Sequence, residues 1–109
     1  MDSDVLMLGF MNEEAWVETQ RTREVVFFSR SRNKLWKKGE SSGHILKVRD
    51  VRMDCDADSL LIRVEAVGPG VCHEGYRSCF FRRLADDGSA QVIERRTFEP
   101  DQIYGQEMR

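Results

Sequence analysis

The chain has 109 residues, the length of one domain, and a single domain is expected over residues 1–109. Hydrophobic residues make up 40% and charged residues 33%, which is typical of a globular protein and excludes a disordered one. With 17 lysines and arginines against 19 aspartates and glutamates, the formal net charge is -2. No general electrostatic attraction to nucleic acid or to a membrane surface is therefore expected.

Taken in chain order, the hydrophobic pattern predicts one or two short helices among several strands. Asn12 is placed to cap a helix that runs to about Gln20, because Glu13 and Glu14 then lie at its positive end. Apolar runs and alternations predict strands at 5–8, 24–29, 45–53 and 59–67, and a hairpin of 79–84 with 91–95 around residues 86–89. The strand at 59–67 should bury the face that carries Leu60, Ile62, Val64 and Ala66. The fold class predicted is α+β with mostly antiparallel strands.

The cysteines bear on both compartment and chemistry. No signal peptide and no run of roughly 18 apolar residues is present, so a cytoplasmic protein is expected. Cys55, Cys72 and Cys79 are an odd number in such a chain, so they should be reduced thiols. Three protein ligands are typical of catalytic zinc, and His73 beside Cys72 would either close the site as a fourth ligand or remain a free base. Three unrelated buried cysteines are the alternative.

Residues 29–39 concentrate positive charge, and no acid follows until Glu40. The cations of this segment are Arg30, Arg32, Lys34, Lys37 and Lys38. A basic loop in an otherwise acidic chain favours a compact anion such as phosphate. Trp36 would stack on a base, or else turn into the core beside a solvated loop.

Asp54, Asp56 and Asp58 alternate along the chain, so their carboxylates would point to one side of an extended segment. Three hard oxygen ligands suit Mg²⁺ or Ca²⁺, but Ser59 stands where an EF-hand loop needs its sixth-position glycine. A plain acidic turn is the alternative. On a regular strand Cys55 would face away from these aspartates, unless the segment is kinked or contacts a second subunit.

Together these segments resemble the phosphoribosyl-AMP cyclohydrolase family of histidine biosynthesis. The resemblance is carried by VLM at 5–7, FMNEEA at 10–15, SRSR at 29–32, LWKKGESSGH at 35–44, DCDAD at 54–58, CH at 72–73 and SCF at 78–80. It implies a hydrolase that opens the N1–C6 bond of the adenine ring of 1-(5-phosphoribosyl)-AMP and that needs zinc and magnesium. It also implies a small barrel-like sheet with one or two short capping helices, completed as a homodimer.

The resemblance assigns roles to individual residues. Asp54, Asp56 and Asp58 would bind magnesium, while zinc would be held by Cys72, Cys79 and a Cys55 contributed by the opposite subunit. His73 or His44 would move the proton, since imidazole titrates near neutral pH. The residues expected to bind the phosphorylated nucleotide are Arg30, Arg32, Trp36, Lys37, Lys38 and Ser42.

Several expectations remain open from the sequence. Glu74 stands where the family has threonine and would add a carboxylate near the zinc. No fused pyrophosphohydrolase domain is recognised, and no nucleic acid or membrane is expected as a partner. Two alternatives are a zinc-stabilised module that binds nucleotide or RNA without turnover, and a related purine or pterin ring hydrolase. A closed four-ligand zinc would favour the binding module.

Overall fold

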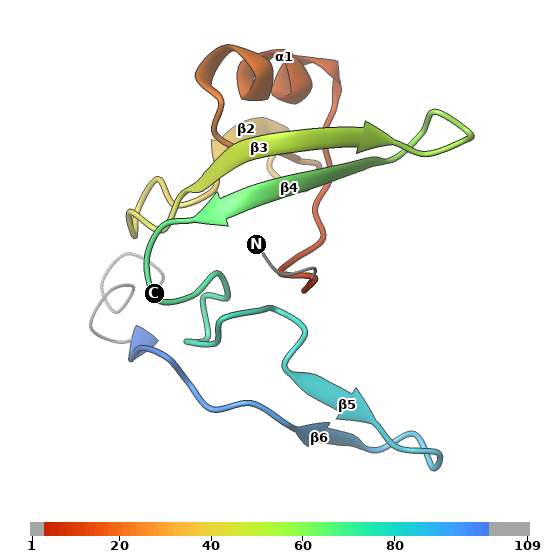
Figure 1. The fold of residues 1–109 in the computed structure, drawn as a ribbon, viewed down its shortest axis with the longest axis vertical. Coiled ribbons are helices and arrows are strands. Elements are labelled where there is room, and N and C mark those ends of the chain that lie inside the picture. Colours follow the sequence, from red (N-terminus) through yellow and green to blue (C-terminus); the bar gives the residue numbers. More distant parts are fainter. Residues whose placement is uncertain (1–3, 101–109) are drawn as a thin grey trace. The chain divides into compact units, whose positions relative to one another are not determined.

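The computed structural model describes residues 4–100, so both ends of the domain predicted at 1–109 lie outside the described residues. The described residues form two compact units, residues 4–8 with 68–100 and residues 9–67. Their elements are α1 (Glu13–Thr22), β1 (Val26–Ser29), β2 (Lys34–Lys37), β3 (Leu46–Met53), β4 (Leu60–Ala66), β5 (Arg82–Leu84) and β6 (Ala90–Val92), as Figure 1 shows. One helix with antiparallel strands confirms the predicted α+β class.

Helix α1 begins where the sequence predicts. The Asn12 side chain accepts a hydrogen bond from the Ala15 N–H at 2.8 Å, which satisfies one of the free donors of the first turn. The helix buries Ala15 and Thr19 and packs against β1. Thr19 Oγ1 accepts from the Val26 N–H at 3.0 Å and donates to the Ala15 carbonyl at 2.9 Å, so one buried hydroxyl joins the helix to the strand. Arg23 ends the helix with a left-handed backbone.

Residues 9–67 contain two hairpins. Strand β1 pairs with β2 from Val26–Lys37 to Ser29–Lys34, and β3 pairs with β4 in the long hairpin of Figure 1. A bulge at Arg49 shifts the register of the second hairpin. The core of this unit consists of Ala15, Val25, Val26, Phe27, Leu46 and Val48.

The predicted barrel-like sheet is wrong for residues 4–100, which hold three separate two-stranded sheets and no closed barrel. Each named strand pairs only with its neighbour in sequence, and Glu24 adds a single bridge to Lys47. A barrel needs every strand edge to continue into the next strand, and these hairpins leave edges unpaired within the described residues.

Two further strand predictions need correction. Residues 5–8 form no strand, because their backbone bonds go to an irregular loop: the Leu6 carbonyl accepts from the Cys79 N–H at 2.7 Å. In β4, Leu60 and Ala66 are exposed and Ile62 and Val64 are half-buried, so the expected buried face is not covered within the described chain. Alternation identified the strand correctly but could not show what covers it.

The other unit is built around an aromatic pair. The rings of Tyr76 and Phe81 stack with centroids 3.8 Å apart, and Cys72 and Cys79 pack in the same cluster. Strands β5 and β6 form the predicted hairpin, but each has three residues, 82–84 and 90–92, where 79–84 and 91–95 were predicted. Its turn is held by Asp87 accepting from the Ser89 N–H at 2.9 Å. Among residues 4–100, no helix has the length and apolar character that a membrane span requires.

Candidate functional site: an acidic turn, a cysteine loop and a basic turn

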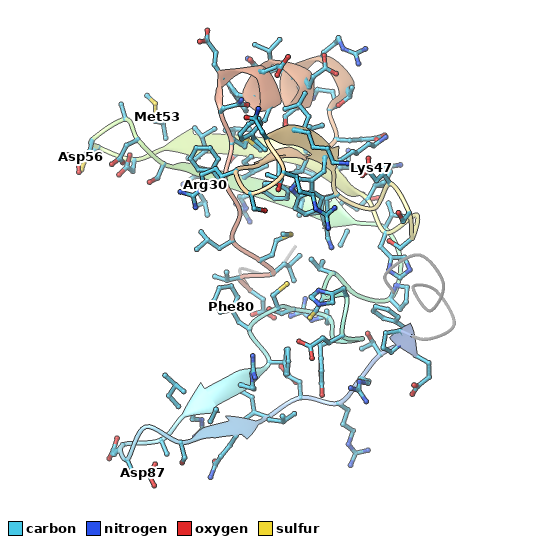
Figure 2. All side chains as sticks on the ribbon, turned by 180° about the vertical axis from the view of Figure 1, so that it is seen from behind. Arg30, Lys47, Met53, Asp56, Phe80 and Asp87 are labelled. Atoms are coloured by element: carbon cyan, nitrogen blue, oxygen red, sulfur yellow. The ribbon has the colours of Figure 1, made fainter. Side chains whose placement is uncertain are left out.

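The three aspartates meet in the turn between β3 and β4, which we call the acidic turn (residues 54–59). One carboxylate oxygen from each of Asp54, Asp56 and Asp58 lies within 4.8 Å of the others. Figure 2 shows Asp56 at the tip of this hairpin, and all three side chains are exposed. The sequence predicted correctly that the three carboxylates converge, but it predicted that they do so on an extended segment. The chain instead turns, with Ala57 in a left-handed conformation at φ 60°.

Hydrogen bonds within the acidic turn distinguish Asp54 from its neighbours. Its Oδ1 accepts from the Asp58 N–H at 3.1 Å and from the Ser59 N–H at 3.2 Å. These donors, the Asp58 N–H foremost, hold the pKa of Asp54 below its ordinary value. Asp54 is therefore a carboxylate that shapes the turn and still lies beside the other two. Oxygen donors at this spacing fit a hard cation such as Mg²⁺.

The cysteines lie in both units. Cys55 is exposed on the acidic turn, whereas Cys72 is buried and Cys79 half-buried in residues 68–100. The Glu74 N–H donates to Cys72 Sγ at 3.5 Å. Cys72 and Cys79 pack in one cluster and are thiols of the kind that a soft metal such as zinc prefers, whereas Cys55 belongs to the other unit.

The loop of Cys72 is held by residues that sequence reasoning missed. Gly75 has φ 98° and its carbonyl accepts from the Thr97 N–H at 2.7 Å, while its own N–H donates to the Cys72 carbonyl at 3.0 Å. Arg96 Nε donates to the Glu74 carbonyl at 2.8 Å. Residues 96 and 97 thus fix the backbone around Cys72. No local pattern signals such contacts, since they join segments distant in sequence.

The basic turn (residues 30–33, between β1 and β2) carries two of the predicted phosphate-binding residues. Arg30 and Arg32 are exposed. The Arg30 guanidinium carbon lies 4.5 Å from the ring centroid of Phe10. Asn33 completes the turn with φ 53°, a conformation that asparagine tolerates well. Exposed guanidinium groups on a short turn can form paired hydrogen bonds with a phosphate.

The tryptophan and the lysines predicted to bind the nucleotide lie on β2 and directly after it, and they are less exposed than Arg30 and Arg32. Trp36 is half-buried and packs on Phe27, with ring centroids 5.1 Å apart, so one part of its surface belongs to the core. The Lys37 ammonium forms an ion pair with Glu24. Lys38 is buried. The positive segment seen in the sequence therefore divides into the exposed Arg30, Arg32 and Lys34 and the more enclosed Lys37 and Lys38.

The two histidines differ in environment. His44 is buried, and its backbone N–H donates to Ser42 Oγ at 3.1 Å. His73, next to Cys72, is exposed, as is Glu74. The hydroxyl of Ser42, a residue predicted to bind substrate, thus holds the backbone of His44.

Comparisons with known proteins match this set of residues to one family. A sequence profile described as phosphoribosyl-AMP cyclohydrolase matches residues 7–81. A protein of that name from Solibacter usitatus is 57% identical over 101 residues, covering 93% of this chain and 79% of its own. Another from Methanosarcina barkeri is 52% identical over 104 residues, covering 95% and 77%. A third from Desulforapulum autotrophicum is 48% identical over 101 residues, covering 93% and 81%.

These similarities, together with the small α+β fold, define the chain as a hydrolase of histidine biosynthesis. It belongs to the phosphoribosyl-AMP cyclohydrolase family. All of the sequence-predicted site residues, from Arg30 to Cys79, lie within the matched range 7–81.

Proposed function

We propose that the chain hydrolyses 1-(5-phosphoribosyl)-AMP by opening its adenine ring between N1 and C6, as a cytoplasmic homodimer that uses zinc and magnesium. The observation that carries this proposal is the family match over residues 7–81, which includes every candidate metal ligand, substrate-binding residue and proton carrier. In the reaction, water adds at C6, the C6–N1 bond breaks and a proton moves to N1. The oxygen of water becomes the carboxamide oxygen.

The metal ligands follow from donor chemistry. Cys72 and Cys79 would hold zinc with a Cys55 contributed across the dimer interface, and Asp54, Asp56 and Asp58 would hold magnesium. When bound, zinc supplies a water nucleophile at neutral pH. The packing of Cys72 and Cys79 in one cluster and the convergence of the three carboxylates support these assignments.

The remaining residues bind substrate and move the proton. Arg30 and Arg32 would grip a phosphate through their paired N–H donors, and the exposed part of Trp36 would contact the base. Lys37, Lys38 and Ser42 would complete the pocket, with Lys37 held in place by Glu24. His73 or His44 would carry the proton to N1. A proton carrier must be accessible and must be held in a fixed position. His73 is exposed beside Cys72 and meets the first requirement, and His44, held by its loop, meets the second.

An absorbance assay of ring opening tests the proposal. Protein freed of metal by a chelator is mixed with phosphoribosyl-AMP, alone and after addition of Zn²⁺, Mg²⁺ or both. We expect turnover only when zinc is present and faster turnover with magnesium. Cys79→Ala is the matched inactive control. Tight nucleotide binding by equilibrium dialysis with no absorbance change under any metal condition would instead identify a binding module without turnover.

A further inference from the structure

Arg30 is held by an aromatic ring, in contrast to several other cations of the same compact unit. Arg21, Arg49 and Arg52 each pair with a carboxylate, and so does Lys37, so part of their charge is neutralised within the protein. Among residues 4–100 no acidic side chain forms an ion pair with Arg30; its guanidinium lies over the Phe10 ring instead. An aromatic ring attracts a cation through its quadrupole without supplying a neutralising charge.

The ring of Phe10 is itself fixed. It meets the ring of Phe28 edge to face, with centroids 6.3 Å apart and planes at 60°. The Phe10 carbonyl also accepts from the Phe28 N–H at 2.8 Å, which ties its backbone to β1. Phe10 is nevertheless 41% exposed, so the contact lies at the surface, where a bound ligand can reach Arg30.

Such an arrangement pre-orders a long flexible side chain. A free arginine at a turn samples many rotamers and loses that freedom when it grips a ligand. A ring that already holds the guanidinium lowers this cost and leaves the N–H donors around the edge of the guanidinium for an anion.

We propose that Phe10 is a positioning residue, which holds the Arg30 guanidinium ready for a phosphate group of the nucleotide substrate. This inference rests on the proposed function, in which Arg30 contacts phosphate. Phe10 acts through Arg30, and its loss weakens substrate binding without slowing the chemical step, because the phosphate contact is the same in ground and transition states.

The first test compares ring-free and ring-bearing variants of Phe10. Phe10→Leu should raise KM about two- to five-fold with kcat unchanged, the range for a cation–π contact at an exposed site. Phe10→Tyr keeps the ring and should restore the wild-type KM. Phe10→Met repeats the test with a second ring-free side chain should the leucine variant fold poorly. A fall in kcat with constant KM, or failure of Phe10→Tyr to restore KM, would overturn the proposal.

A double-mutant cycle then distinguishes this inference from the proposed function. Arg30→Ala should raise KM about ten-fold or more, as expected for loss of a charge-assisted hydrogen bond. Phe10→Leu/Arg30→Ala should show the KM of Arg30→Ala alone, because the ring then has nothing to position. Additive effects would refute the role of Phe10 while leaving the phosphate contact intact. No effect of Arg30→Ala would refute the phosphate contact itself.

A matched control comes from the other compact unit. The Arg82 guanidinium lies over the Phe81 ring at 4.9 Å, a contact of the same kind but with no proposed part in substrate binding. Arg82→Ala should leave KM unchanged. A KM rise equal to that of Phe10→Leu would show that any surface cation–π contact affects binding, and would count against a specific role for Phe10.

Discussion

The backbone of Gly39 lies directly against that of His44. A methyl group on Gly39 would be 2.5 Å from the His44 carbonyl carbon, and Gly39 has φ 87°. Both the close approach and the left-handed backbone require glycine. The loop from Lys38 to Gly43 therefore has a fixed path, closed by the Gly43 N–H donating to the Gly39 carbonyl at 2.7 Å. This path sets where His44 lies.

Gly39→Ala should lower the free energy of unfolding by about 2–4 kcal/mol, because it combines backbone strain with a steric clash. Gly43→Ala is a matched control: Gly43 has φ 79° but nothing lies near its missing methyl group, so only the strain of about 1 kcal/mol should appear. Urea denaturation measures both. Equal losses in the two variants would mean that the Gly39–His44 contact relaxes freely.

In the acidic turn, we expect Asp56 to contribute to magnesium binding and not to zinc binding. Asp56→Asn should weaken the magnesium dependence of turnover and leave zinc content intact, because carboxylates select hard ions and thiolates select zinc. Atomic absorption and a magnesium titration check this. A parallel loss of zinc in Asp56→Asn would show that the aspartates support the zinc site and form no site of their own.

Asp54 should also give the protein a pH dependence. Its pKa is lowered in the folded state by the Asp58 and Ser59 N–H donors, so its contribution to stability is fully present above the unfolded aspartate pKa of about 4. That contribution is lost as pH falls through the lower folded value. In Asp54→Asn, the free energy of unfolding should therefore fall less steeply with acidification below about pH 4. An unchanged slope in denaturant titrations would contradict this.

Arg32 and Lys38 should behave differently although both come from one basic segment. Arg32 is exposed, so Arg32→Ala should raise KM more than it lowers kcat and change stability by no more than about 0.5 kcal/mol. Lys38 is 8% exposed, so Lys38→Ala should also lower the free energy of unfolding, by about 1–3 kcal/mol. Steady-state kinetics beside thermal unfolding measures the difference. A wild-type KM in both variants would exclude a role of this segment in substrate binding.

The proposed dimer predicts recovery of activity from two inactive variants. Cys55→Ala and Cys79→Ala should each be nearly inactive. In mixed dimers one site carries both lesions and the other neither, since a two-fold interface repeats each contact. Random pairing after refolding makes about half the dimers mixed, so roughly a quarter of wild-type activity should return. If mass spectrometry finds mixed dimers without activity, all three thiols act within one subunit.

Local signals predicted the elements they control. Asn12 capping, and a turn at residues 86–89, depend on neighbouring residues, and both are confirmed. The strand Lys34–Lys37 was missed because its cations hid an apolar pair, Leu35 and Trp36. The kink at Ala57 was left open because alanine has no preference for a left-handed backbone.

The sequence indicated which residues belong to the candidate site, but not which residues each of them contacts. The aspartates and cysteines follow from their chemistry and from family resemblance. The contacts of Phe10 with Arg30 and of Glu24 with Lys37 depend on how α1 and the first hairpin pack, which no periodicity encodes. Tertiary contacts of this kind decide which cations remain available for a ligand.

The hairpin of β5 and β6 has every residue of both strands exposed, whereas Leu46 and Val48 of β3 are buried. Within the chain, β5 and β6 thus gain little from side-chain burial, and their cross-strand bonds can open without disturbing the Tyr76–Phe81 cluster. In deuterated water the amide hydrogens of Arg82–Leu84 should exchange early, on local opening. Those of Leu46 and Val48 should be retained until residues 9–67 unfold as a whole. We therefore expect the slowest amide exchange among the described residues in this unit.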